Sequence, residues 1–314
     1  MYDYRRNSET YNQRLINRGK ITVYISPAAE RQIHDLKEKN KGKVGHPFEF
    51  SDDLILGLFS IKCLFKFPYR QLQGFAEDLS SFLRIKVVPN FRTINDRMID
   101  FKDIGMTFDV KATPKGLEVS IDASGWKRNN DGEYRSMKYD KRKDWKKIHL
   151  VVDNMTGRIL NVKVTNSRTS DTTMFRKLLQ PLKTFLKKIC ADSGYDSEKN
   201  FKFCNKNTIY PAIPVKSNAT TTRYCPNRRH AVAEQFGLEI KRGRVSHKDM
   251  LTANQKTKNQ KKWKKGVKYG DRWRVEGIFS ATKRIFGEFV FSKRDDLIEK
   301  EIMIKFKIYN SFLD

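Results

Sequence analysis

Three acidic residues occupy positions where a carboxylate could take part in chemistry. Asp122 ends the alternating stretch LEVSID, Asp192 ends the apolar stretch KKICAD, and Glu276 lies in a later segment with helical spacing. A single acid after a strand usually only caps the following turn, so neither aspartate alone indicates a site. Carboxylate oxygens are also the ligands that hard cations such as Mg²⁺ prefer. The type of chemistry to test for is therefore that of a divalent metal ion.

The segment around Glu276 favours the chemical interpretation over turn capping. The spacing Y-x2-R-x3-E-x6-K is formed by Tyr269, Arg272, Glu276 and Lys283. On one α-helix these four side chains project within about 60° of one another. Tyr269 shares this face only if the helix begins before Gly270. The adjoining side is apolar and is formed by Val275, Ile278, Phe279 and Phe286. The helix is expected to present a carboxylate beside groups able to hold phosphate, although a solvated charged face is the alternative.

Apolar patterning predicts the elements that position these residues. The expected order is strands at 117–122, 149–153 and 158–165, a helix at 170–182, a strand at 187–192, a helix at 197–206, a strand at 209–215, a basic segment, and a helix at about 271–286. This is the order of a ribonuclease H-like α/β fold, a mixed sheet flanked by helices. Its first strand lies next to its fourth, so Asp122 and Asp192 are expected to meet at the ends of adjacent strands.

These residues carry a family resemblance. The Y-x2-R-x3-E-x6-K helix resembles the signature of prokaryotic insertion-sequence transposases of the DDE class. SIDASGWK, RKDWKKIHLVVDNMTGRILNVKVTNSRTSD and ICADSGYDS resemble successive blocks of that catalytic domain, and YNQRLINRGKITVYI and YRQLQGFAEDL resemble its N-terminal region. The resemblance covers about residues 10–312. The Lys-rich stretch between Asp192 and Glu276 departs from the family pattern, because it shows no clear inserted strand domain.

The resemblance implies a mechanism and a set of partners. Asp122, Asp192 and Glu276 become the catalytic, metal-binding triad for two Mg²⁺ ions, with Mn²⁺ as a possible substitute, and Tyr269, Arg272 and Lys283 become DNA contacts. The implied reaction is cleavage at the element ends and strand transfer into target DNA. The implied partners are double-stranded DNA, both terminal inverted repeats and target, and a second copy of the chain, since two ends must be brought together.

The charge of the chain agrees with a polyanionic partner. Sixty-four Lys and Arg against 36 Asp and Glu give a net charge of +28, and phosphate contacts dominate the affinity of proteins for DNA. Two basic segments, 135–147 and 256–268, predict a DNA track, although charged loops are usually only solvated. The lysines expected to contact DNA are Lys143, Lys146, Lys147, Lys264 and Lys265.

The chain is expected to divide into a helical region over 1–110, which binds DNA ends, and a catalytic domain over 111–314. Amphipathic helices are expected at 52–65, 68–83 and 91–101. They fit a helix-turn-helix reader or a simple three-helix packing equally well. There is no run of about 18 apolar residues and no signal peptide, which favours a cytoplasmic, nucleoid-associated protein without membrane contact.

Two other functions remain open, and several weaker candidate residues are assigned structural roles. A nuclease of the junction-resolvase type would share the fold and the metal site, and a catalytically silent DNA-binding protein would share only the DNA affinity. His149 is expected to be a buried histidine, Asp153 to begin a turn, and Asp171 to cap a helix. The four cysteines lack CxxC spacing and are expected to be reduced thiols, of which Cys190 lies in the core.

Overall fold

The computed structural model describes residues 36–83, 87–101, 116–128, 145–216, 224–241, 244–245 and 251–313, together with the single residues 12, 16, 19 and 20. The chain forms two units. An α/β unit spans 106–281, and a helical unit combines 1–105 with 282–314. This division differs from the expected 1–110 and 111–314 at the C-terminal end, because the last helix packs against the N-terminal helices.

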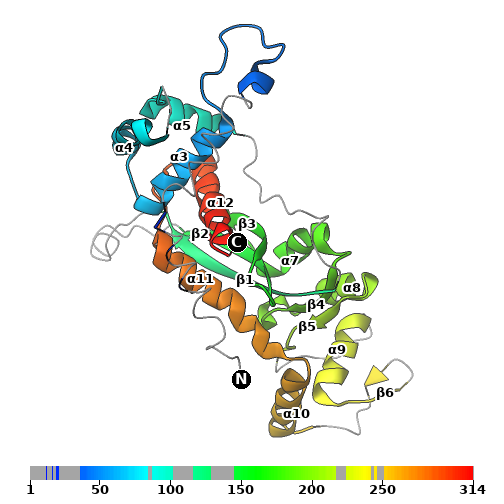
Figure 1. The fold of residues 1–314 in the computed structure, drawn as a ribbon. Coiled ribbons are helices and arrows are strands. Elements are labelled where there is room, and N and C mark those ends of the chain that lie inside the picture. Colours follow the sequence, from blue (N-terminus) through cyan, green and yellow to red (C-terminus); the bar gives the residue numbers. More distant parts are fainter. Residues whose placement is uncertain are drawn as a thin grey trace, which may run out of the picture. The chain divides into compact units, whose positions relative to one another are not determined.

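A five-stranded mixed sheet is the frame of the α/β unit (Figure 1). Its strands are β1 (Leu117–Lys127), β2 (Trp145–Asp153), β3 (Ile159–Asn166), β4 (Leu186–Cys190) and β5 (Tyr210–Ala212), in the spatial order β3-β2-β1-β4-β5. β1 pairs antiparallel with β2 and parallel with β4. The first strand therefore lies next to the fourth, which confirms the expected ribonuclease H-like arrangement.

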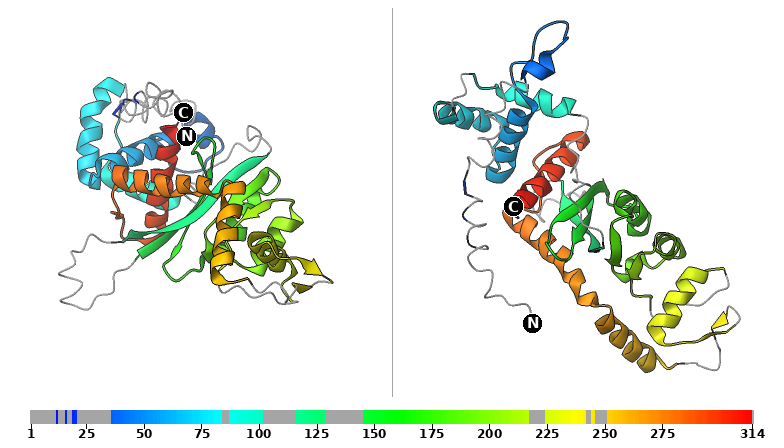
Figure 2. Two further views of the ribbon diagram at one scale, coloured as in Figure 1. Left: turned by 90° about the horizontal axis from the view of Figure 1, so that it is seen from below. Right: turned by 45° about the vertical axis from the view of Figure 1, so that its right-hand side comes forward.

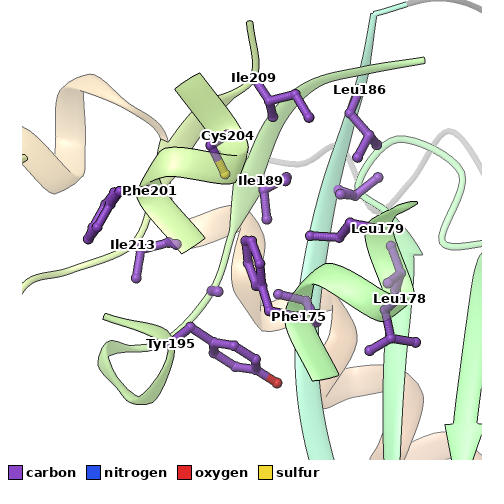
Figure 3. Packing of buried hydrophobic residues seen from close by; sticks show 14 of the residues in the cluster. Phe175, Leu178, Leu179, Leu186, Ile189, Tyr195, Phe201, Cys204, Ile209 and Ile213 are labelled. Atoms are coloured by element: carbon purple, nitrogen blue, oxygen red, sulfur yellow. The ribbon is translucent and has the colours of Figure 1, made fainter. Parts of the chain in front are cut away.

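The alternation in β1 gives the sheet two different faces. Val119 and Ile121 point into an apolar core, where neither is exposed. This core is closed by α7 (Asp171–Leu179), α8 (Glu198–Lys206) and α9 (Pro226–Phe236). Figure 3 shows side chains of α7 and α8 meeting those of β4 in this core, with Tyr195 at its margin. The other face of β1 carries the polar residues of the alternation, and this face positions the site described below.

That polar face is covered by a segment that joins two helices. Helix α10 (Ala253–Gly266) leads through the 3₁₀ turn η3 (Tyr269–Arg272) into α11 (Trp273–Phe286). η3 contacts both β1 and β4. The views in Figure 2 place α7 and the start of α11 on opposite sides of the sheet. The sheet is thus covered by an apolar layer on one side and by the segment that carries Glu276 on the other.

The helical unit contains α3 (Asp52–Phe65), α4 (Tyr69–Leu83), α5 (Phe91–Asp100) and α12 (Asp295–Ser311). Asn90 caps α5 by accepting a hydrogen bond of 2.8 Å from the Thr93 amide. An unexposed ion pair lies in α12, between Glu301 and Lys305 at 2.7 Å. Burial raises the pKa of Glu301, but Lys305 and Lys62 outweigh burial and hold that pKa below its ordinary value. No helix in the described ranges is long and apolar enough to span a bilayer.

Three features of the α/β unit differ from the sequence predictions. β1 does not end at Asp122 but continues to Lys127, because β2 stays paired with it as far as Trp145. The basic segment before η3 contains the helices α9 and α10 and a short hairpin of β6 (Ile240–Lys241) and β7 (Arg244–Val245). α10 has no buried residue and is fixed by polar contacts, which an apolar pattern cannot reveal.

Candidate active site

The centre of the candidate site is Asp122, on the polar face of β1. Its side chain is 20% exposed, and its carboxylate accepts a hydrogen bond of 2.8 Å from the amide of Ala123. Because side chains alternate along a strand, Asp122 shares its face with Ser120 and Glu118 and faces away from the apolar core. The alternating pattern LEVSID predicted this separation of polar and apolar residues.

Arg272 joins two of the three acids. Its guanidinium donates a hydrogen bond of 3.2 Å from Nη1 to Asp122 Oδ2 and one of 2.5 Å from Nη2 to Glu276 Oε1. Arg272 and Glu276 are one helical turn apart, so their spacing placed them on the same side of the segment, as predicted. Glu276, in the first turn of α11, keeps 51% of its side chain exposed. Arg272 thus supplies positive charge between a half-buried acid and an exposed one.

Asp192 lies just after β4 and begins the turn η2 (Ser193–Tyr195). Its carboxylate accepts a hydrogen bond of 2.8 Å from the Gly194 amide. A Cβ atom on residue 194 would lie 2.9 Å from Asp192 Oδ1, so a larger residue there would force the Asp192 carboxylate to shift. The strand-end aspartate therefore makes the turn-capping contact, and it also lies near enough to Asp122 to act on its charge.

The electrostatics show that the three acids share one neighbourhood. The pKa of Asp122 is raised, mainly by burial and further by the negative charges of Asp192 and Glu276, against the opposing effects of Ala123 and Arg272. An acid that is costly to ionise beside two other acids is a position where an added cation would relieve repulsion.

The donor set fits a divalent metal ion in kind. All three candidate ligands are carboxylates, which suit Mg²⁺ or Mn²⁺ better than they suit softer metals. In the described part of the chain, no three His, Cys, Asp or Glu side chains are arranged to hold one ion as they lie. Arg272 is the cation that contacts Asp122 and Glu276 in this arrangement.

Tyr269 does not belong to the helix that carries Glu276. The backbone at Lys268 is left-handed, with φ of 52°, residues 269–272 form η3, and α11 begins at Trp273. The condition under which Tyr269 would share the face of Glu276, a helix that begins before Gly270, is therefore not met. Its hydroxyl instead donates a hydrogen bond of 3.2 Å to the carbonyl of Ala191, beside Asp192. Lys283 lies on α11, in the part of this helix that belongs to the helical unit.

The predicted DNA-contacting lysines occupy different environments. Lys147 forms an ion pair of 2.7 Å with Asp171 and donates to the carbonyl of Thr169. Lys146 donates to Asn166 at 3.0 Å. Lys264 lies 5.3 Å from the centre of the Tyr269 ring, and Lys265 is exposed on the same helix. Lys143 falls outside the described residues.

The weaker candidates have structural surroundings. His149 is fully buried, its Nε2 lies 2.9 Å from Thr165 Oγ1, and burial lowers its pKa to about 4, against the opposing charge of Asp171. Asp153 accepts hydrogen bonds from the amides of Met155 and Thr156, as expected for the start of a turn. Asp171 is the first residue of α7, and Ser170 rather than Asp171 holds the cap position.

The sequence pattern assigned no role to Tyr195, which lies within the block ICADSGYDS. It is 1% exposed, and its hydroxyl has no hydrogen-bond partner in the described residues. Its pKa is raised, chiefly by burial and then by Asp171, Asp122 and Asp192. The aromatic residue three positions after Asp192 was the available signal, but nothing in the sequence shows that its hydroxyl lies close to these acids.

Comparisons with known proteins identify a family for this chain. Residues 113–311, more than half of the chain, match the family model of a transposase DDE domain, and residues 16–131 match a second model with the same description. Among solved structures, the chain is similar to the piggyBac transposase synaptic complex with hairpin DNA (13% identity, TM-score 0.42, covering 98% of this chain and 76% of that one). It is also similar to the Drosophila P element transposase strand transfer complex (13% identity, TM-score 0.32, covering 95% and 71%).

A third structure is the simian T-cell lymphotropic virus intasome in complex with the PP2A regulatory subunit B56 gamma (12% identity, TM-score 0.23, covering 63% of this chain and 68% of that one). At TM-scores this low the similarity to solved structures supports no conclusion about this chain. The family models alone assign it to a family. The first of these family models covers the mixed sheet and the segment that carries Glu276: this chain belongs to the transposase DDE domain family and is a DDE transposase, an enzyme of metal-dependent DNA cleavage and strand transfer.

Proposed function

We propose that this chain is the transposase of an insertion sequence and that Asp122, Asp192 and Glu276 are its catalytic, metal-binding residues. The observation that supports this most directly is the raised pKa of Asp122, to which both Asp192 and Glu276 contribute. Asp192, after β4, and Glu276, in α11, both act on Asp122 of β1, and Arg272 contacts Asp122 and Glu276. A structural ion pair would need only one acid for each base.

The proposed cofactor is Mg²⁺, bound as two ions, with Mn²⁺ as a substitute. When bound, the two ions would make an attacking hydroxyl nucleophilic and stabilise the leaving oxygen of a phosphodiester. The role of the protein in this reaction is to hold the three acids in place. Asp122 is held by the Ala123 amide, Asp192 by the Gly194 amide, and Glu276 by the first turn of α11. Arg272 is placed to contact a DNA phosphate near these acids once it releases a carboxylate.

Helix α10 is proposed as a phosphate track leading to the acids. One side of α10 is anchored by Asn259, which donates to the Phe236 carbonyl, and by Gln260, which donates to the Val215 carbonyl. This anchoring leaves the opposite side for solvent, and the exposed lysines are Lys258, Lys261, Lys262 and Lys265. Since α10 continues through η3 into α11, a DNA strand held on these lysines is led toward Arg272. Lys264 and Lys283 extend the proposed contacts.

The helical unit is proposed to bind the element ends. A groove of about 720 Å³ lies between α4 and α5. Among its lining residues are Arg70, Gln71, Arg92 and Asn95, side chains that hydrogen-bond phosphates and base edges. The Arg70 guanidinium lies 4.7 Å from the centre of the Phe91 ring, which holds it at the groove. A dimer is proposed because two element ends must meet in one complex.

The deciding experiment compares Asp122→Ala, Asp192→Ala and Glu276→Ala with the control Glu299→Ala, an exposed acid in α12. Each triad variant should lose at least about 10³-fold in Mg²⁺-dependent cleavage and in joining of a pre-cut element end to plasmid. DNA binding should stay within about twofold, because phosphate contacts carry the affinity. The substrate is DNA with the inverted repeats that flank the gene.

Two outcomes would overturn the proposal. Cleavage retained by a triad variant would remove that residue from the site. A wild-type protein that cuts branched junctions but never joins an element end would be a nuclease rather than an insertion-sequence transposase. Lys283→Ala should weaken end binding and reduce its dependence on salt, in keeping with one lost phosphate contact.

A further inference from the structure

Lys188 is a buried lysine in the middle of β4 to which the proposed mechanism gives no role. It is 8% exposed, whereas the lysine next to it in the chain, Lys187, is exposed. Lysines are almost never buried unless they are paired. The surroundings of Lys188 therefore need an explanation of their own.

The ammonium group of Lys188 contacts the segment that carries Arg272 and Glu276. It forms an ion pair with Glu118 and another, at 3.6 Å, with Asp271, and it donates a hydrogen bond of 3.2 Å to the Val267 carbonyl. An ammonium has three N–H donors, and here three acceptors surround it. Burial alone would lower the pKa of Lys188, but the hydrogen bond to Glu118 and the nearby acids outweigh it, so that pKa is raised. The group is charged and fully engaged.

The register of the sheet explains how these groups meet. Glu118 of β1 stands opposite Lys188 of β4, and Ser120 stands opposite Cys190. Glu118, Ser120 and Asp122 share one face of β1, and each lies beside the covering segment. Ser120 Oγ lies 3.4 Å from the Asp271 carbonyl, and Asp122 contacts Arg272 at 3.2 Å. The polar residues of LEVSID thus form a row of attachment points, and Lys188 links the first of them to residues 267–271.

The attached segment needs such support. Lys268, between α10 and η3, has a left-handed backbone with φ of 52°. Residues other than glycine adopt this conformation at some cost in free energy. The Lys188 contact falls on the Val267 carbonyl, directly before this residue, and the Tyr269 hydroxyl contact with Ala191 falls directly after it. The junction between α10 and η3 is therefore fixed from both sides.

We propose that Lys188 is a positioning residue: by pinning Val267 and Asp271 to β1 and β4, it sets where α11 begins and so holds Glu276 in reach of Asp122 and Asp192. This inference rests on the proposed catalytic role of Glu276. It concerns placement only, because Lys188 contacts neither DNA nor the reacting atoms in this proposal. Replacing a residue that orients a metal ligand without binding the metal itself commonly changes metal affinity or activity.

The test compares Lys188→Met with Lys187→Met in the full-length protein. Both changes remove one lysine charge from β4, but only Lys188 contacts the covering segment. Hydrogen exchange of the amides in 267–276 should become several-fold faster in Lys188→Met and stay unchanged in Lys187→Met. The Mg²⁺ concentration for half-maximal cleavage should rise about tenfold in Lys188→Met, with the dissociation constant for DNA within about twofold of wild type.

Lys188→Arg keeps the charge and the donors and should restore most of the wild-type Mg²⁺ dependence. If Lys188→Met fails to fold by circular dichroism, Glu118→Gln tests the same contact and should show the same changes at smaller size. Wild-type exchange and wild-type Mg²⁺ dependence in Lys188→Met, or equal changes in Lys187→Met, would overturn the inference. The exchange measurement needs no activity, so a failure of Glu276→Ala to stop cleavage would refute the proposed function without being confused with a failure here.

Discussion

Two ion pairs in this protein have the same spacing along the chain and opposite surroundings. Glu301 and Lys305 are four residues apart in α12, and neither side chain is exposed. Arg272, the last residue of η3, and Glu276, in the first turn of α11, are also four residues apart, with 23% and 51% of their side chains exposed. The Glu301 carboxylate also accepts hydrogen bonds from the amides of Phe291 and Ser292. Lys305 also donates to the carbonyl of Phe289, so both members of the buried pair have further partners within the helical unit.

The difference between the pairs lies in how the acids are stabilised. Two lysines hold the pKa of Glu301 below its ordinary value in spite of burial. The acid that shares Arg272 with Glu276 is Asp122, and its pKa is raised. One cluster has more positive charge than its acid needs, and the other has more acid than one arginine can offset. Complete pairing indicates a structural role, and incomplete pairing of partly exposed acids indicates a site for a further cation.

The largest effect on stability is expected at the buried pair. Glu301→Gln leaves Lys305 and Lys62 without their acid and should lower the free energy of unfolding by about 3 kcal/mol. Urea unfolding measures this loss, with Glu299→Gln in the same helix as the exposed control. Because the pKa of Glu301 is lowered on folding, its contribution is present above its ordinary pKa of 4.5 and is lost as pH falls through the lowered value.

The difference between wild type and Glu301→Gln should therefore shrink in acid. A loss in the free energy of unfolding below about 1 kcal/mol at neutral pH would show that the buried pair is no stronger than a surface pair. The proposed difference between the Glu301–Lys305 and Arg272–Glu276 pairs would then be refuted.

A smaller effect of opposite sign is expected at Asp122. Asp122→Asn removes an acid that is costly to ionise and should raise the free energy of unfolding by about 1 kcal/mol in metal-free buffer, while DNA cleavage is lost. Since the pKa of Asp122 is raised on folding, the wild type loses stability relative to the variant as pH rises from the ordinary value of 3.8 through the raised one.

Thermal unfolding in EDTA and in Mg²⁺ measures this difference. Metal bound to the native state should stabilise the wild type and remove or reverse the advantage of Asp122→Asn. If the Asp122→Asn protein is less stable than wild type in EDTA, Asp122 stabilises the fold as Glu301 does, and its role is structural.

The smallest effect is expected at the exposed partner. Glu276→Gln breaks the partly exposed ion pair with Arg272 and should change the free energy of unfolding by no more than about 0.5 kcal/mol. The same change should abolish DNA cleavage. Urea unfolding and the end-joining assay on the same preparation check both statements. A loss as large as that of Glu301→Gln would remove the difference between the two pairs.

The sequence could predict what depends on pattern and spacing. Alternation in LEVSID predicted β1 and its two faces, and the order of strands and helices predicted that β1 lies beside β4. The four-residue spacing placed Arg272 and Glu276 together. One prediction is wrong and one condition is not met, each for an identifiable reason. β1 continues past Asp122 because β2 pairs with it, and pairing partners are not visible in a single stretch. Tyr269 lies outside α11 because residues 269–272 form the 3₁₀ turn η3, and α11 begins only at Trp273.

Other elements were hidden because they do not follow the simple apolar rule. α10 has no buried residue and is held by Asn259 and Gln260, so it resembles a charged loop in sequence. α12 buries Glu301 and Lys305, which interrupt the apolar pattern that would have revealed it. The same limit applies to Lys188, since a lysine within a strand gives no sign that it has three partners across the sheet.

The discontinuous helical unit also sets an order of events during synthesis. Lys62 leaves the ribosome early, but Glu301 and Lys305 follow only after the whole α/β unit has been made. At about 5–20 residues per second, the N-terminal helices wait on the order of ten to fifty seconds for α12. Until then α3 lacks one of the helices that it packs against. The nascent chain therefore completes the α/β unit that carries Asp122 and Asp192 before it can complete the unit that contains α3, α4 and α5.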